Sequence, residues 1–291
     1  MTQTLPLAVS QPIRPAQQKQ IVNLVRRAAK TEILPRFQNM ATVQITTKSG
    51  PFDLVTEADT AAEAMIARGL ARLFPGVLIV GEEAVSKTPK LRDQIAEQDL
   101  AFIVDPIDGT WNFANGLATF GVIISATRFG KPVFGLLYDA MNDDYVIADS
   151  SDDPARHVSA RGTSRPIQVT QSKSFDMMSG YIHFSLLSKD EKEKMAPNLL
   201  PFAFTTSLRC SCHEYRLLSR GRVDFILSTM LNPWDHAAGV FICEKAGGVA
   251  KFLDGEEYNT ARTQGQLLTA ATQETWDALR DHFDIWGKDP N

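Results

Sequence analysis

Asp105-Pro106-Ile107-Asp108-Gly109-Thr110-Trp111-Asn112-Phe113 is the most informative stretch of this chain. The apolar run 100–104 before it is typical of a buried strand, and the Asp-Pro and Asp-Gly pairs predict that this strand ends at Asp105. Pro106 fixes one φ angle and Gly109 permits a tight turn. Two carboxylates three positions apart on such a turn can point at one spot, with the hydroxyl of Thr110 beside them.

Two like charges this close together are costly unless a cation lies between them. Carboxylate and carbonyl oxygens suit a hard ion, Mg²⁺ or Ca²⁺. The alternative on this stretch alone is that the Asp residues cap a turn or a helix, which is a common role for them.

Two further stretches favour the metal hypothesis. The run 77–80 is typical of a short strand and leads into Gly81-Glu82-Glu83. Later, Trp234-Asp235-His236-Ala237-Ala238-Gly239 places an acid beside an aromatic residue at the expected start of a helix. In this order the three motifs resemble those of the inositol monophosphatase family, whose members are Mg²⁺-dependent, Li⁺-sensitive phosphatases. The resemblance covers residues 21–279.

The resemblance implies an α+β fold, a five-layered α-β-α-β-α sandwich of the inositol monophosphatase / fructose-1,6-bisphosphatase type. We expect an N-terminal tail (1–15), a half with most metal ligands (16–150) and a half with Asp235 and the substrate residues (151–291). Runs 120–128, 132–138 and 144–148 predict a meander, so the first sheet should be largely antiparallel. The Ser-, Asp- and Pro-rich segment 150–165 is expected to be a surface excursion between the halves.

The resemblance also implies roles for individual residues. Glu82, Asp105 and the Ile107 carbonyl would hold a first Mg²⁺; Asp105, Asp108 and Asp235 would hold a second; Glu82 would reach a third, weaker ion. Thr110, backed by Asp59, would orient the attacking water, and the amides of Gly109 and Thr110 would bind phosphate oxygens. Mn²⁺ is a possible substitute, and Li⁺ and Ca²⁺ are expected inhibitors.

The chain departs from the family pattern near the expected substrate. Arg209-Cys210-Ser211 stands where inositol phosphatases commonly have Gly-Ser/Thr-Ala, and Ser228 stands where an acid usually contacts inositol hydroxyls. Glu214 lies in an unusual segment, and Lys48 matches a lysine near the family's active site. Arg209 could hold an acidic group of the substrate, fill the space of the inositol ring, or pair with a surface acid such as Glu214. Histidinol, sugar and nucleotide phosphates therefore stay open beside inositol phosphate.

Composition narrows the function further. The net charge of −4 gives no electrostatic case for nucleic acid binding. Three cysteines without a Cys-x-x-Cys pair fit a reducing cytoplasm, and the spacing within Cys210-Ser211-Cys212-His213 is too tight for the usual zinc site. No apolar run approaches the ~20 residues that span a bilayer, and the N-terminus does not resemble a secretory signal. We expect a small phosphorylated metabolite as partner and, from the resemblance, a homodimer. Two other functions compete with the phosphatase hypothesis. One is a catalytically silent family member that binds a protein partner. The other is a Ca²⁺-stabilised structural protein, against which the Thr110–Asp59 pair argues.

Overall fold

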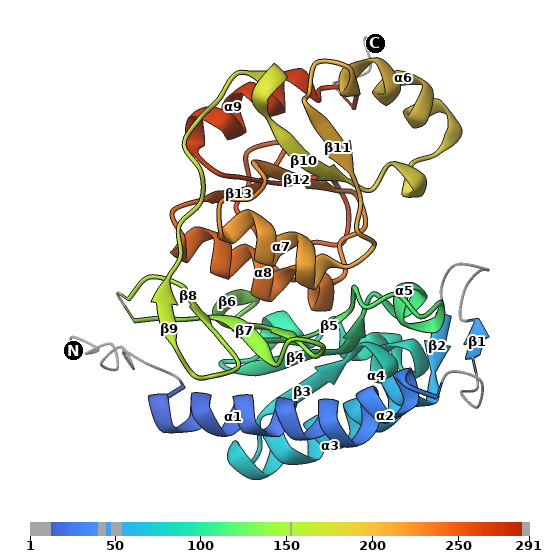
Figure 1. The fold of residues 1–291 in the computed structure, drawn as a ribbon, viewed down its shortest axis with the longest axis vertical. Helices are drawn as coiled ribbons and strands as arrows, with labels where there is room; N and C mark the ends of the chain where they lie inside the picture. Colours follow the sequence, from blue (N-terminus) through green and yellow to red (C-terminus); the bar gives the residue numbers. More distant parts are fainter. Residues whose placement is uncertain (1–12, 40–44, 48–53, 152, 287–291) are drawn as a thin grey trace, which may run out of the picture.

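The computed structural model describes residues 13–39, 45–47, 54–151 and 153–286. Its helices and sheets form five stacked layers, and Figure 1 shows them edge on. From one end of the molecule to the other, the layers are α6 with α9, a five-stranded sheet, α7 with α8, a seven-stranded sheet, and α1 with α3. The five-layered α-β-α-β-α sandwich expected from the sequence is therefore the observed fold.

The seven-stranded sheet is antiparallel except for the parallel pair β3–β4. Its order is β3 (Leu78–Gly81), β4 (Ala101–Asp108), β5 (Gly121–Arg128), β6 (Lys131–Asp139), β7 (Asp144–Asp149), β8 (Arg156–Val158) and β9 (Ser164–Pro166). The predicted meander is thus confirmed as β5, β6 and β7. A separate small ribbon pairs β1 (Ile45–Thr47) with β2 (Leu54–Thr56).

The five-stranded sheet is mixed, with β10 parallel to both of its neighbours. Its order is β11 (Phe204–Thr206), β10 (Ser179–Ile182), β12 (Phe225–Ser228), β14 (Leu267–Ala270) and β13 (Val249–Phe252). The described helices are α1 (Pro15–Ala28), α2 (Leu34–Phe37), α3 (Glu57–Leu73), α4 (Glu82–Lys87), α5 (Thr110–Ala114), α6 (Lys189–Leu199), α7 (Ser211–Ser219), α8 (Pro233–Lys245) and α9 (Gln273–His282).

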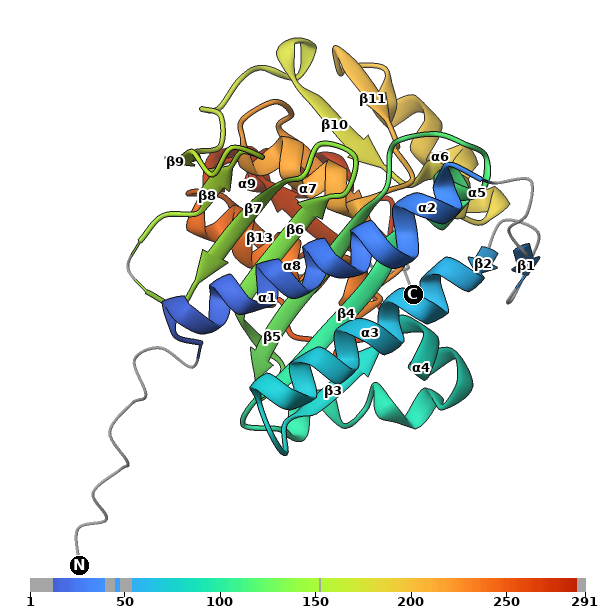
Figure 2. The same ribbon diagram turned by 60° about the horizontal axis from the view of Figure 1, so that its bottom comes forward.

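Helix α3 shows how the sequence positions a site residue. Ala58, Ala62, Ile66 and Leu70 recur at intervals of four and are buried, so this face packs on the sheet beside α1 (Figure 2). The hydroxyl of Thr56 caps the first turn, and the backbone N–H of Thr56 donates to Asp59 Oδ2 at 2.8 Å. The cap therefore fixes the carboxylate of Asp59 at the start of the helix.

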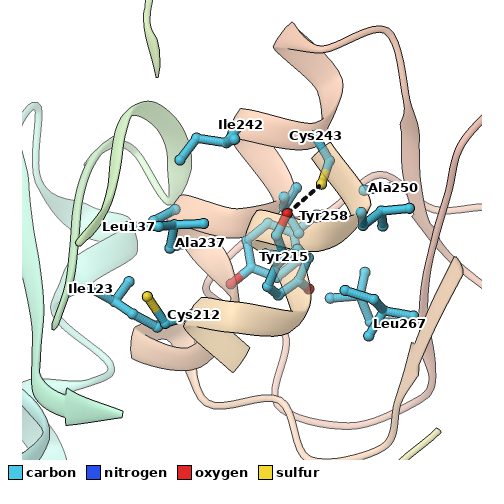
Figure 3. Packing of buried hydrophobic residues seen from close by; sticks show 14 of the residues in the cluster. Ile123, Leu137, Cys212, Tyr215, Ala237, Ile242, Cys243, Ala250, Tyr258 and Leu267 are labelled. Carbon is cyan, nitrogen blue, oxygen red and sulfur yellow. Dashed lines mark hydrogen bonds between the residues drawn. The ribbon is translucent and has the colours of Figure 1, made fainter. Parts of the chain in front are cut away.

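The central core lies between the two sheets, around α7 and α8. Figure 3 shows Tyr215 and Tyr258 between Ile123 and Leu137 of the seven-stranded sheet and Leu267 of the other sheet. A Cβ on Gly239 would lie 2.1 Å from the ring of Tyr215, so α8 needs a glycine there for α7 to pack this closely. The glycine of the Trp-Asp-x-Ala-x-Gly motif thus has a packing role.

The structure corrects two expectations. Strand β4 does not end at Asp105: it continues to Asp108, with a shift of its register against β5 between those two residues. Segment 150–165 is not only a surface excursion, because β8 and β9 extend the seven-stranded sheet past residue 150. Both errors arise because pairing with a neighbouring strand overrides local turn signals. Residues 1–12 of the expected tail and the whole connection 48–53 of the ribbon, which includes Lys48, lie outside the described residues.

Candidate active site

Three acidic side chains converge between the two halves of the molecule. Asp105 and Asp108 come from the end of β4, and Asp235 comes from the first turn of α8. One carboxylate oxygen from each lies within 4.8 Å of the other two. Asp105 and Asp108 are buried, and Asp235 is partly buried. We call these three residues the acid cluster.

The acid cluster concentrates carboxylates in a largely buried place. Burial raises the pKa of Asp105 well above its usual range, and the charges of Glu82, Asp108 and Asp235 raise it further. Burial also raises the pKa of Asp108 to about 6, against hydrogen bonds from Cys212 and Cys210 that lower it. Carboxylates that are buried together in this way favour either a proton or a cation.

Two further candidate ligands lie next to the acid cluster. Glu82 is the first residue of α4, which begins where β3 ends beside β4, and its charge is the strongest neighbouring influence on Asp105. The carbonyl of Ile107 lies between the two Asp residues in the chain and accepts a hydrogen bond from Thr110 Oγ1 at 2.9 Å. The oxygen donors are therefore carboxylates and a carbonyl, which suit Mg²⁺.

Thr110 and Asp59 meet although 51 positions separate them. Thr110 Oγ1 lies 3.1 Å from Asp59 Oδ1 and 2.9 Å from the Ile107 carbonyl oxygen. Asp59 Oδ2 accepts hydrogen bonds from the amide and hydroxyl of Thr56, so the carboxylate cannot rotate freely. This geometry orients the hydroxyl of Thr110 at the edge of the acid cluster.

Asp108 also joins the two halves of the molecule. Its Oδ2 accepts hydrogen bonds from the backbone N–H of Cys212, at the start of α7, and from the thiol of Cys210 at 3.1 Å. Both bonds use the same oxygen and hold the carboxylate in one orientation. Next in the chain, Gly109 has φ +85°, and a Cβ there would lie 2.9 Å from the carbonyl oxygen of Thr119 and 3.2 Å from Cys210 Cβ. A side chain at this position would push the halves apart.

Arg209 packs against the ring of Trp111. Its guanidinium carbon lies 3.9 Å from the centre of the Trp111 ring, a cation–π contact with the segment that contains Thr110. The backbone of Arg209 has φ +53°, in the left-handed region that favours glycine. The chain thus keeps a backbone shape suited to the glycine common in inositol phosphatases, but adds a cationic side chain.

The other expected substrate residues have different surroundings. Glu214 is fully buried and bonds to His183, Ser207 and Leu208, so the expectation that it is a surface acid pairing with Arg209 is wrong. Ser211 begins α7 and is buried against Asp108. Ser228 ends β12 with 1% exposure, and its hydroxyl has no hydrogen-bond partner among the described residues.

Two residues that the sequence analysis did not single out contribute to this region. His183 bonds to Glu214 at 2.8 Å, and Asn112 Nδ2 donates to the carbonyls of Thr119 and Leu208, both at 2.8 Å. The one sequence signal for His183 is its position directly after the apolar residues that form β10. The three cysteines are free and buried, and His213 bonds to the Phe120 carbonyl, so this segment does not gather zinc ligands.

Two surface hollows lie outside the acid cluster. One of about 480 Å³ is lined by the hairpin β8–β9 and residues after α7, including His157, Arg165 and Arg222. The other, of about 290 Å³, is lined by Asp139, Arg216 and their neighbours. Neither contains a member of the cluster, so the candidate site is identified by its acids. Within the part of the chain that the structure describes, no helix is long and apolar enough to span a bilayer.

Comparison with known proteins places this geometry in context. A model of the inositol monophosphatase family matches residues 17–282. A fructose-1,6-bisphosphatase/inositol-1-monophosphatase of Thermotoga maritima is 29% identical over 219 residues, which cover 73% of this chain and 76% of that protein. A Nus factor SuhB of Vibrio cholerae is 28% identical over 82% of this chain and 87% of its own length. Among solved structures, the extragenic suppressor protein suhB of Bartonella henselae has a TM-score of 0.78 at 22% identity, covering 93% of this chain and 99% of that one.

Proposed function

Because the chain belongs to the inositol monophosphatase family, we propose that it hydrolyses small phosphate monoesters with Mg²⁺ as cofactor. The observation that carries this proposal is the acid cluster: Asp105, Asp108 and Asp235 place three carboxylate oxygens within 4.8 Å. Their burial and mutual repulsion favour a bound divalent cation, and the neighbouring Ile107 carbonyl adds a ligand of the same hard type.

The residues present fit two Mg²⁺ ions. Glu82, Asp105 and the Ile107 carbonyl would hold the first, and the acid cluster would hold the second, with a third, weaker ion at Glu82. When bound, Mg²⁺ would neutralise phosphate oxygens, activate water and stabilise the leaving alkoxide. The two hydrogen bonds on Asp108 Oδ2 fix that carboxylate for its role, because they prevent it from turning away.

The protein's own groups would orient the attack. The single proton of Thr110 Oγ1 lies within reach of both Asp59 Oδ1 and the Ile107 carbonyl. Donated to Asp59, it would leave the lone pairs of the hydroxyl to accept a hydrogen bond from the attacking water. Asp59 would hold the Thr110 proton in place from the start of α3. The amides of Gly109 and Thr110, carried over from the family, would bind the phosphate oxygens. Water would then attack phosphorus, and the alcohol and inorganic phosphate would leave.

The substrate is proposed as an inositol-1-phosphate-like monoester, with histidinol, sugar or nucleotide phosphates as alternatives. Arg209 and Ser228 support the alternatives, because neither offers the carboxylate that would accept hydrogen bonds from inositol hydroxyls. A phosphate-release screen over these four classes, with Mg²⁺ and with EDTA, tests the proposal. Release from none of them in the presence of Mg²⁺ would contradict it.

A second candidate function is regulatory binding of a protein partner. Relatives of similar identity carry the name Nus factor SuhB, and such a role would not need hydrolysis. The complete set of candidate ligands and the Thr110–Asp59 pair favour the enzyme, since a binding module needs no water-orienting hydroxyl. We further propose, by family analogy, a cytoplasmic homodimer, which light scattering against the monomer mass of 32.2 kDa would test.

Lithium sensitivity is part of the same proposal. A small monovalent ion that replaces the second Mg²⁺ would hold product phosphate in the site, and excess Mg²⁺ or Ca²⁺ would inhibit there too. Rates measured over a LiCl series should fall, while the matched KCl series should leave them unchanged. Equal effects of the two salts would argue against a second cation at the acid cluster.

A further inference from the structure

A buried polar group adjoins the acid cluster without belonging to it. It lies at the carboxyl end of the five-stranded sheet, where β10, β11 and β12 run parallel. His183 directly follows β10, and Ser207 directly follows β11. Carboxyl ends of neighbouring parallel strands form one edge, which is the usual place for ligands in open α/β sheets. These residues therefore lie where a substrate would meet the C-terminal half.

Glu214 of α7 organises this edge. Its Oε2 lies 2.8 Å from His183 Nε2, and its Oε1 accepts hydrogen bonds from the Leu208 amide at 2.7 Å and the Ser207 hydroxyl at 3.1 Å. Ser207 Oγ in turn accepts from the Arg209 amide at 3.0 Å. Glu214 is 0% exposed and already receives three donors, so its burial keeps it from direct contact with a substrate.

His183 has one ring nitrogen left over. Nε2 is held by Glu214, and among the described residues Nδ1 makes no hydrogen bond, while the side chain keeps 13% exposure. Helix α7 connects His183 to the acid cluster, because Glu214 contacts the ring and Cys212, two positions earlier, donates to Asp108. The charges of Asp235 and Asp108 also act on the ring. His236 of α8 is the other titratable neighbour, and its two nitrogens are occupied by Tyr215 and the Met230 carbonyl.

We propose that His183 Nδ1 and the Arg209 guanidinium form the subsite for the alcohol part of the substrate, and that this subsite selects phosphate monoesters with a second anionic group. The guanidinium donates hydrogen bonds, and the protonated His183 ring donates from Nδ1, so both groups can carry positive charge. The carboxylate that contacts His183, Glu214, is buried and already bonded to three donors. An anion, either carboxylate or phosphate, complements such a subsite better than a polyol does. This inference rests on the proposed phosphatase function and names the substrate class for it.

The test uses two pairs of esters. 3-Phosphoglycerate and glycerol 3-phosphate differ only by a carboxylate in place of CH₂OH; fructose 1,6-bisphosphate and fructose 6-phosphate differ by a second phosphate. For at least one pair, kcat/KM of the wild type should be about tenfold or more higher for the more anionic member, the size of one charge-assisted hydrogen bond. Which pair shows the preference distinguishes a carboxylate from a phosphate ligand.

His183→Gln is the decisive variant. A Gln amide can replace Nε2 in the bond to Glu214 but has nothing at the position of Nδ1, so the fold should persist. The preference should fall about tenfold, through a raised KM for the anionic ester and an unchanged KM for the neutral one. His157→Gln is the matched control, because His157 also pairs with a carboxylate, Asp144 at 3.0 Å, outside the site. Arg209→Ala is a second variant, which removes the other member of the subsite at an exposed position.

The outcomes separate this inference from the proposed function. If esters are hydrolysed but both members of each pair react equally, or if His183→Gln keeps the wild-type ratio, the inference is wrong while the phosphatase stands. An equal loss in His157→Gln would also overturn it, because the effect would then be structural. If no ester is hydrolysed, the ratio of dissociation constants measured by calorimetry in the presence of Ca²⁺ decides the inference in the same way.

Discussion

The acid cluster and the His183–Glu214 pair are both largely buried groups of titratable side chains that contact α7, but only the pair contains a side chain of opposite charge. Glu214 has an opposite charge at 2.8 Å and two further donors. Asp105 has four acidic neighbours, Glu82, Asp108, Asp235 and Asp59, that all raise its pKa. The pair contains its own counter-charge, so loss of one partner would destabilise the fold, whereas the cluster costs stability until a cation binds. The difference suggests which part of the site is scaffold and which part is made for a ligand.

Asp105→Asn removes one carboxylate charge from the acid cluster and so tests the cluster's side of the comparison. We expect kcat/KM to fall about a thousandfold or more, because a metal site supplies several kcal/mol to the barrier. Without metal the variant should melt no lower than wild type, since a repelled charge is removed. With Mg²⁺ only the wild type should gain melting temperature. The control is Asp281→Asn, which changes an exposed acid paired with Arg280. Wild-type activity in Asp105→Asn would refute the assignment of Asp105 as a metal ligand.

Glu214→Ala removes the partner of His183 and so tests the pair's side of the comparison. The free energy of unfolding should fall by about 3 kcal/mol or more, because His183 would be left buried without its partner. Urea titration measures the change. Glu214→Gln keeps one acceptor oxygen and should lose clearly less. If the two variants unfold at the same urea concentration as wild type, the pair does not stabilise the fold.

The pH dependence of stability sharpens the comparison. Burial acts to lower the pKa of His183, but the charge and hydrogen bond of Glu214, with Asp235 and Asp108, outweigh it and raise the pKa. The folded state therefore binds this proton more tightly than the unfolded state. The stabilisation is complete below the unfolded pKa of about 6.5 and is lost as pH rises through the folded value, by at most about 1.4 kcal/mol per pH unit.

The measurement is the difference in free energy of unfolding between wild type and His183→Gln from pH 6 to pH 9, without Mg²⁺. This difference should shrink as pH rises. A difference that grows with pH would mean that the ring is neutral in the folded protein.

Arg209 gives the smallest effect and tests the joint between the two regions. At φ +53° a residue with a Cβ is strained, and glycine is not. Arg209→Gly should therefore be about 1 kcal/mol more stable than Arg209→Ala, although both lose the contact with Trp111. Thermal melting of the two variants decides it. Equal stability would show that the backbone moves out of the left-handed region once the arginine is gone.

Local patterns predicted much of this molecule. The meander follows from alternation and turn residues, and the start of α8 follows from the Asn-Pro pair before Trp234. The extension of β4 to Asp108 could not be predicted, because pairing with β5 decides it. Nor could the burial of Glu214, which depends on His183 from a strand 31 positions away. Residues whose role is set by a distant partner leave no local pattern in the sequence.

The bond between Asp108 and Cys212 spans 104 positions of the chain. A ribosome makes the chain from its N-terminus, so Asp105 and Asp108 emerge long before α7 and Asp235 exist. Until residue 235 has left the ribosome, these two carboxylates have neither their anchor nor the third member of their cluster. Contacts of such separation form late in folding. A nascent chain should therefore not retain a divalent cation at this place. Retention would begin only after residue 235 has left the ribosome and the two halves have docked.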